Sequence, residues 1–228
     1  MCFSTTASFS AGIILSVISI ASVKKVKKTE QLYFAGIPVL FCIQQFAEGF
    51  IWFFLTNSIY HSLQVIATYV FLFLAQVVWP LLIPFSLFML EKDLKRKKIM
   101  KIVLGIGMLV SFYLGYCLIF YDVEAKIIGN HISYLQNYPI LFGDYGDSFY
   151  LIATIAPPFI SSIKRMWILG AIIFVSYVIT AILYTDYIIS VWCFFASIIS
   201  LMVCILIYQM ENKNIKKAIM NSNEPLHF

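Results

Sequence analysis

Long hydrophobic runs separated by short polar gaps dominate the sequence. A helix that crosses a bilayer core of about 30 Å needs about 20 apolar residues, at a rise of about 1.5 Å per residue. Seven runs meet this requirement, two of them marginally. They predict helices at about 3–23, 32–56, 63–90, 99–121, 148–163, 166–184 and 187–208.

Two of these runs contain prolines, and one long polar stretch interrupts the series. Pro80 and Pro84 are expected to kink the third helix, and the Pro157-Pro158 pair lies in the short fifth run. The segment 122–147 is rich in acidic residues and carries a Gly-Asp-Tyr-Gly turn signal. It is therefore predicted to be a loop in water.

Positive charge alternates with the gaps between the runs. Fifteen of the sixteen lysines and arginines lie in clusters at every second gap, and only Lys126 lies elsewhere. The clusters comprise Lys24, Lys25, Lys27 and Lys28; Lys92, Lys95, Arg96, Lys97, Lys98 and Lys101; Lys164 and Arg165; and Lys213, Lys216 and Lys217. Because cations near a spanning helix are retained in the cytoplasm, seven crossings are predicted, with the N-terminus and loop 122–147 outside. The tail 209–228 would then be cytoplasmic.

Composition supports this all-α, polytopic interpretation. The 228 residues are 61% hydrophobic and 12% charged, and the mean hydropathy of +0.90 excludes a water-soluble domain. The net charge of +5 is divided among short loops, so it predicts no nucleic-acid surface. The first run lacks a preceding basic region, which argues against a cleaved signal peptide. We therefore expect a single seven-helix transmembrane domain over residues 1–228, in a cell membrane.

Glu48 is the candidate with the clearest chemistry, because it is the only acidic residue inside any run. An ionised side chain near the bilayer centre costs about 2.5–3.5 kcal/mol, so such a carboxyl is protonated, paired or turned towards the bundle interior. Three side chains lie within about one helical turn of it: Gln44, Gln45 and Trp52. This polar stripe predicts a binding or proton-handling site. The alternative is a set of interhelical hydrogen bonds that only hold the bundle together.

Small residues share single faces of other predicted helices. They are Ser190, Cys193, Ser197, Ser200 and Cys204 in the seventh helix; Ser8, Gly12 and Ser16 in the first; and Gly107, Ser111 and Gly115 in the fourth. Small side chains let helices approach closely, so packing is the favoured interpretation and a lined cavity the alternative.

The histidines and cysteines predict neither a metal site nor a cofactor. His61 and His131 belong to outer loops and His227 to the cytoplasmic tail, so the three cannot converge in one monomer. No Cys-x-x-Cys pair and no phosphate-binding glycine loop is present. Cys2 would offer an N-terminal thiol if Met1 were removed. A disulfide among Cys2, Cys117 and Cys193 is left open by the spacing.

Several motifs resemble an uncharacterised family of bacterial multi-pass membrane proteins. They are Met1-Cys2-Phe3-Ser4, Ile43-Gln44-Gln45 followed by Glu48-Gly49, Ala153-Thr154 with Pro157, and Ser-Val-Trp-Cys-Phe-Phe-Ala at 190–196. Cys42 stands where the family pattern has glycine. The resemblance extends over the whole chain and implies a seven-helix bundle in a bacterial, most simply inner, membrane. It implies no substrate.

Together these features favour a small-molecule or ion binding protein, either a transporter or a sensor, rather than an enzyme. The predicted outward-facing pocket comprises Gln44, Gln45, Glu48, Trp52, Thr154, Cys193 and Ser197. A membrane-embedded enzyme acting on lipid or an outer-leaflet substrate is the first alternative, with Glu48 as acid or base and Cys2, His131 or Tyr134 as weaker candidates. A scaffold is the second. The expected partners are the lipid bilayer and a small ligand, and the oligomeric state stays open.

Overall fold

The computed structural model describes residues 4–139, 146–184 and 187–222, and most of them are helical. The α-helices are α1 (Thr5–Lys25), α2 (Thr29–Ala35), α3 (Ile37–Leu55), α4 (His61–Leu72), α5 (Trp79–Leu90), α6 (Leu94–Phe120), α7 (Gly146–Ile160), α8 (Met166–Leu183), α9 (Ile188–Phe194) and α10 (Ala196–Ser222). A 3-10 turn, η1 (Ser58–Tyr60), precedes α4, and a π-helical segment, η2 (Phe73–Val78), joins α4 to α5. Strands β1 (Val123–Ile128) and β2 (His131–Gln136) follow α6.

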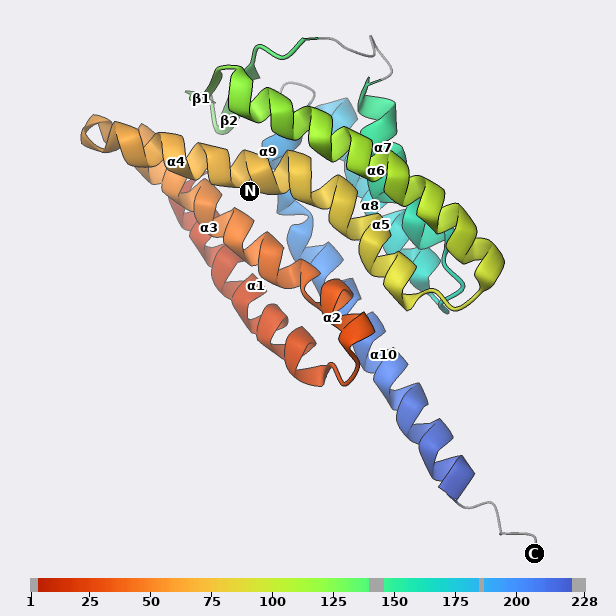
Figure 1. Cartoon of the computed structure of the whole chain (residues 1–228). Coiled ribbons are helices and arrows are strands. Elements are labelled where there is room, and N and C mark those ends of the chain that lie inside the picture. Colours follow the sequence, from red (N-terminus) through yellow and green to blue (C-terminus); the bar gives the residue numbers. More distant parts are fainter. Residues whose placement is uncertain (1–3, 140–145, 185–186, 223–228) are drawn as a thin grey trace, which may run out of the picture.

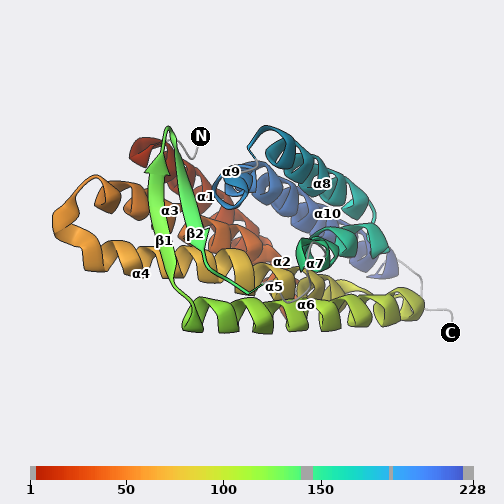
Figure 2. The ribbon, with the colours of Figure 1, turned by 90° about the horizontal axis from the view of Figure 1, so that it is seen from above.

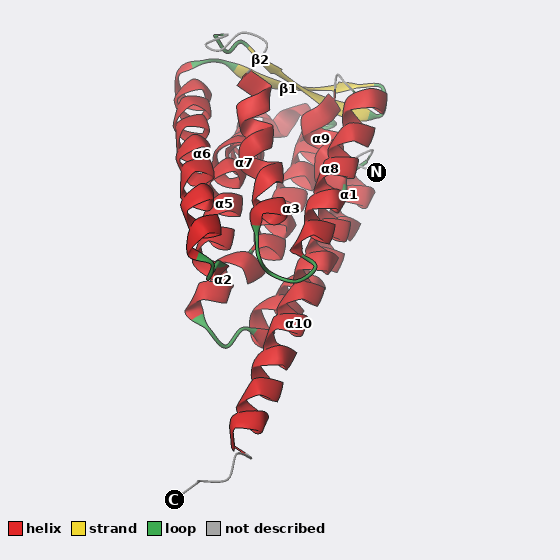
Figure 3. Ribbon diagram, turned by 90° about the vertical axis from the view of Figure 1, so that its right-hand side faces the viewer, coloured by secondary structure: helices red, strands yellow, loops and turns green. Residues whose placement is uncertain are grey.

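The helices form an elongated bundle, with the β-hairpin across one end and α10 projecting beyond the other (Figures 1 and 3). Six helices in the described residues are long and apolar enough to cross a membrane. Their bounds are Thr5–Lys25, Thr29–Leu55, His61–Leu90, Leu94–Phe120, Met166–Leu183 and Ile188–Asn212. The remaining predicted crossing corresponds to α7, which has 15 residues and contains Pro157 and Pro158. It extends over about 22 Å at the usual helical rise.

The exterior of the bundle is apolar, whereas many polar side chains lie inside. Phe112, Leu109 and Ile102 of α6 are 78%, 72% and 67% exposed. The buried polar side chains include Gln44, Gln45, Glu48, Gln64, Gln76, Ser190 and Ser200. An apolar exterior of this extent fits a membrane protein.

The predicted third helix is irregular in its middle. Pro80 has no N–H, so the regular hydrogen-bond ladder is interrupted one turn earlier, where η2 forms. Two carbonyls of η2 receive hydrogen bonds from neighbouring helices: Tyr150 Oη of α7 donates to Ala75 O at 2.6 Å, and Ser111 Oγ of α6 donates to Val77 O at 2.7 Å. These two hydrogen bonds connect the irregular segment to α6 and α7.

The glycines predicted to allow close helix packing do so. A Cβ added to Gly107 would lie 2.0 Å from the carbonyl oxygen of Pro80, so α6 contacts the backbone of α5 directly. Between α1 and α3, a Cβ on Gly12 would lie 3.1 Å from the Phe46 ring, and one on Gly49 would lie 3.1 Å from the Phe9 ring. The packing interpretation of the first and fourth predicted helices is confirmed.

The structure places a β-hairpin at 123–136, within the segment 122–147 that was predicted to be a loop. Strands β1 and β2 pair antiparallel, with Ile128 opposite His131 across a two-residue turn in which Gly129 has a φ of 61°. The hairpin extends over the ends of α3 and α4 and reaches α9 (Figure 2). Ala125 and Ile132 are buried there in one cluster with Ile51. The alternation of apolar and polar residues in a six-residue strand is a weak sequence pattern, and the long apolar runs on either side obscure it.

We expect Gly107→Ala to destabilise the protein, because its methyl group would overlap Pro80 O. Overpacking of this kind costs about 1–3 kcal/mol. Gly105 is the matched control on the same helix, since a Cβ there meets nothing within 4 Å. Gly105→Ala should leave the melting temperature in detergent unchanged or raise it slightly, since alanine favours helix. Equal melting temperatures for the two variants would contradict the close approach of α5 and α6.

Candidate functional site

Glu48 lies inside the bundle and contacts a residue 142 positions away. Its side chain is 0% exposed. Ser190 Oγ, on α9, donates a hydrogen bond to Glu48 Oε1 at 2.5 Å, and Ser190 is also 0% exposed. A buried carboxyl is costly unless it is protonated or receives hydrogen bonds, and the Ser190 hydroxyl provides one. The sequence placed Ser190 on the small-residue face of its helix but not among the pocket candidates.

Gln44 lies one turn before Glu48 and bonds to the third predicted helix. Trp79 Nε1 donates to Gln44 Oε1 at 2.8 Å, and the Trp79 ring stacks on Phe41 with centroids 4.1 Å apart. Gln45 is 2% exposed. The polar stripe of α3 is thus buried, with partners on α9 and α5. Trp79, at the start of α5, gave no sequence signal beyond being an aromatic residue in an apolar run.

Trp52 continues the stripe towards the hairpin. It belongs to the buried cluster that also contains Phe71, Ala125 and Ile132. Within the described ranges its indole Nε1 is buried and has no hydrogen-bond partner. The polar stripe of α3 therefore ends beneath β1 and β2.

Polar and aromatic contacts fasten the hairpin and the residues after it to the bundle. Gln76 Nε2, on η2, donates to Gln136 Oε1 at 2.9 Å, and Tyr138 Oη donates to Gln76 Oε1 at 3.2 Å. Tyr134 stacks on Phe71 with ring centroids 4.9 Å apart. The hairpin is held by side chains from the irregular η2 and the helix before it.

The weaker candidates His131 and Tyr134 both lie on β2. His131 stacks on Tyr187, with centroids 4.6 Å apart, and meets Tyr184 edge-on. Burial lowers the pKa of His131 below its ordinary value, because the charged imidazolium is less well solvated there. Their side chains contribute to the attachment of the hairpin.

Thr154 and Ser197 are the other pocket candidates whose side chains the structure describes. Thr154 is buried, but its hydroxyl donates to Tyr150 O of its own helix at 2.9 Å. Ser197 is half-buried near the start of α10. Cys2 and the Cys193 side chain lie outside the described residues. Cys117 is buried and free, so it forms no disulfide.

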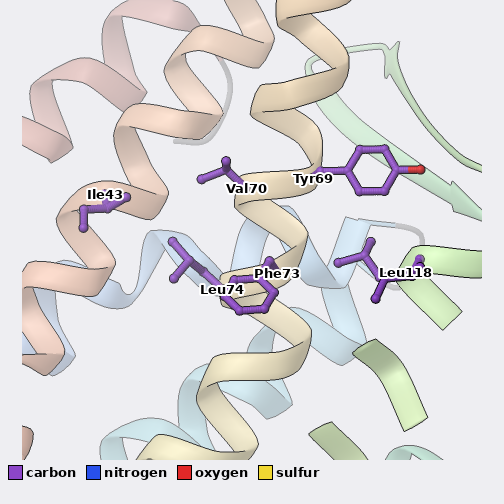
Figure 4. A pocket seen from close by; sticks show the side chains of 7 residues that line it. Ile43, Tyr69, Val70, Phe73, Leu74 and Leu118 are labelled. Atoms are coloured by element: carbon purple, nitrogen blue, oxygen red, sulfur yellow. The ribbon is translucent and has the colours of Figure 1, made fainter. Parts of the chain in front are cut away.

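An open hollow on the outer surface is distinct from the predicted polar pocket. It is lined by Ile43, Tyr69, Val70, Phe73, Leu74, Leu118 and Ile119, from α3, α4, η2 and α6 (Figure 4). None of the pocket candidates lines it. Its lining is apolar except for the Tyr69 hydroxyl. Within the described residues, no group of three or more His, Cys, Asp or Glu side chains could hold a metal ion.

The fold is a helical bundle with an apolar exterior and a hydrophobic core, in which the buried polar stripe of α3 is embedded. The chain belongs to a family of unknown function (DUF6629), which it matches over residues 1–219. The predicted membership of an uncharacterised family is therefore confirmed. No curated protein and no solved structure is significantly similar to the chain.

Ser190→Ala should destabilise the bundle, because the buried carboxyl of Glu48 loses a hydrogen-bond donor. Such a loss costs about 1–3 kcal/mol. Ser197→Ala is the control, since Ser197 is less buried and lies one to two turns further along. Thermal unfolding in detergent should separate the two variants. If Ser190→Ala melts like the control, the Ser190 to Glu48 bond contributes little.

Proposed function

We propose that this protein crosses a membrane seven times, with its N-terminus outside, and binds a small polar molecule or an ion at Glu48. The observation that carries the proposal is the full burial of Glu48, with the Ser190 hydroxyl 2.5 Å from its Oε1. Intramembrane carboxyl groups are costly and commonly mark ion, proton or ligand sites.

The apolar exterior and the distribution of charge support membrane insertion. Lys24 and Lys25 end α1, the cluster 92–101 begins α6, and Lys164 and Arg165 precede α8. These three clusters lie at the end of the bundle opposite the hairpin (Figure 3). Under the positive-inside rule this end is cytoplasmic, and the hairpin and the Glu48 end of α3 face outwards.

Helix α7 is the seventh crossing in this proposal. Its length of about 22 Å is short for a bilayer core of about 30 Å. The chain continues through 161–165 before α8 begins, and local thinning of the bilayer can accommodate a short span. Without this crossing, Lys164 and Arg165 would lie outside.

The surroundings of Glu48 suit a cation or a hydrogen-bonding ligand. A carboxylate in a site of low dielectric constant attracts cations strongly. A protonated carboxyl can also release its proton when a cation binds. The Gln44 and Gln45 amides provide neutral donors and acceptors one turn away. The helix break between α9 and α10, five residues after Ser190, resembles the interrupted helices that form ion sites in transporters.

Access to Glu48 from outside requires the hairpin or a neighbouring helix to move. The hairpin lies over the Trp52 end of the stripe, and its described contacts with the bundle come from Gln76, from aromatic stacking and from the buried apolar side chains of Ala125 and Ile132. Breaking these contacts would separate no ion pair among the described residues. An isolated two-stranded hairpin is marginally stable at best in water, so the hairpin would lose order once it separated from the bundle.

Glu48→Gln should abolish proton- or cation-coupled uptake in vesicles that contain the purified protein. The substitution keeps the size and hydrogen-bonding capacity of the side chain but removes its charge and its titration. Uptake would be followed with a pH-sensitive dye in the lumen while Na⁺ or K⁺ gradients are imposed. Glu30→Gln, at an exposed position of α2, is the control and should leave uptake unchanged. Unchanged uptake in Glu48→Gln would refute a role for this carboxyl.

Seven crossings predict a definite pattern of labelling by a membrane-impermeant maleimide. In a cysteine-free background, Asn137→Cys should react in intact cells, because it is exposed next to the hairpin. Lys98→Cys and Lys164→Cys should react only after the membrane is permeabilised. Reaction of Lys164→Cys from outside would show that α7 does not cross the membrane.

A further inference from the structure

A buried carboxylate holds two loops together at the end of the bundle opposite the hairpin. Glu91 follows α5 and is 2% exposed. Its Oε1 accepts hydrogen bonds from Lys92 N and Asp93 N, each at 2.9 Å, and from Ser162 Oγ at 2.5 Å. Its Oε2 accepts one from Ser162 N at 2.7 Å. The loop between α5 and α6 is thereby joined to the loop between α7 and α8.

Glu91 is ionised at neutral pH despite its burial. Desolvation raises the pKa of its carboxyl, but the four hydrogen bonds from Ser162, Asp93 and Lys92 outweigh this effect and leave the pKa below the ordinary value. Arg96 strengthens the junction by donating from Nη1 to Ile160 O and Ser161 O, both at 2.9 Å. A cation is favourable at this C-terminal end of α7.

The junction merges two basic segments into one surface. Segment 91–101 contains six cations and segment 160–166 contains two, against the carboxylates of Glu91 and Asp93. The oxygens of Glu91 are occupied by hydrogen bonds, and Asp93 Oδ1 caps α6 through Arg96 N. Among the described residues the one salt bridge joins Lys126 to Glu124, in the hairpin at the opposite end. Within the part of the chain that the structure describes, no carboxylate therefore forms a salt bridge with a cation of this surface.

We propose that this surface binds the headgroups of anionic phospholipids. The exposed cations are Lys92, Lys95, Arg96, Lys98, Lys101, Lys164 and Arg165. Lysines bind phosphate as point charges, and cations close to an anionic membrane surface are attracted to it. The neighbouring face of α6 is apolar, with Leu94 and Ile102 exposed at 76% and 67%, and would contact the acyl chains. This combination of charge and apolar surface favours a lipid over a soluble anion.

The inference depends on insertion in a membrane but not on ligand binding at Glu48. Its test therefore uses lipid selectivity, and Glu48→Gln should retain that selectivity in full. If the Glu48 proposal failed, the proposal of lipid binding at the basic surface would be unaffected.

The first experiment measures retention of phosphatidylglycerol against phosphatidylcholine by the purified protein, using native mass spectrometry. Replacing Lys92, Lys95, Lys98 and Lys101 together by Gln should reduce the preference for phosphatidylglycerol several-fold. Replacing Lys24, Lys25, Lys27 and Lys28 by Gln is the matched control, because it removes the same charge from another loop at the same end. Equal loss in both variants would overturn the assignment to this surface. Displacement of the retained lipid by equimolar inorganic phosphate would also overturn it, in favour of a free anion.

The second experiment tests whether the Glu91 junction organises the surface. Glu91→Gln makes the region more positive, so simple charge attraction predicts equal or tighter binding of phosphatidylglycerol. The geometry predicts several-fold weaker preference, because the two basic loops separate. Ser162→Ala removes only one donor and should weaken the preference less, which keeps the test informative if Glu91→Gln does not fold. Both variants must melt cooperatively in phosphatidylcholine. Unchanged or tighter binding in both would refute the organising role of Glu91.

Discussion

Backbone polar groups surrounded by apolar side chains require hydrogen-bond partners, and this constraint shapes the centre of the molecule. Pro80 removes an N–H from the long helix, and the π-helical segment before it exposes carbonyls to the bundle interior. Tyr150 and Ser111 satisfy two of them, from α7 and α6. Gln76 of the same segment also binds Gln136 of the hairpin. One irregular turn therefore connects α6, α7 and the β-hairpin.

The polar stripe on α3 obeys the same constraint through side chains. Gln44 and Glu48 are buried, and their partners Trp79 and Ser190 come from two different helices. Buried polar side chains with a purely structural role would also need hydrogen-bond partners. The hydrogen bonds of Gln44 and Glu48 alone therefore do not distinguish a structural role from ligand binding. A carboxyl differs from an amide because it titrates and attracts cations. In our proposal, ligand binding is favoured because Ser190, the partner of Glu48, lies five residues before the break between α9 and α10, and because the α3 stripe ends beneath the hairpin.

Hydrophobic runs predicted the main helices well, since long apolar segments leave few alternatives to a helix. Glu48 and Gln44 were selected as candidates because acidic and amide side chains are rare in such runs. Ser190 and Trp79 were missed as partners because contacts over 142 and 35 positions depend on how helices pack. The hairpin was missed because apolar and polar residues alternate over only six positions in each strand. Glu91 lies just beyond the end of an apolar run, where a carboxylate is unremarkable, and only its bonds to Ser162 reveal its burial.

The two ends of the bundle are held in physically different ways. At the hairpin end the described contacts come from amide, phenol, aromatic and apolar side chains, and breaking them would separate no ion pair among the described residues. At the basic end an ionised Glu91 is saturated by backbone and hydroxyl donors, and breaking that junction would leave a charge without its donors, which is costly. Motion that admits a ligand to Glu48 is therefore expected at the hairpin end, about a base kept rigid by Glu91. A rigid base held against anionic headgroups would keep the bundle at a constant depth while the hairpin end opens.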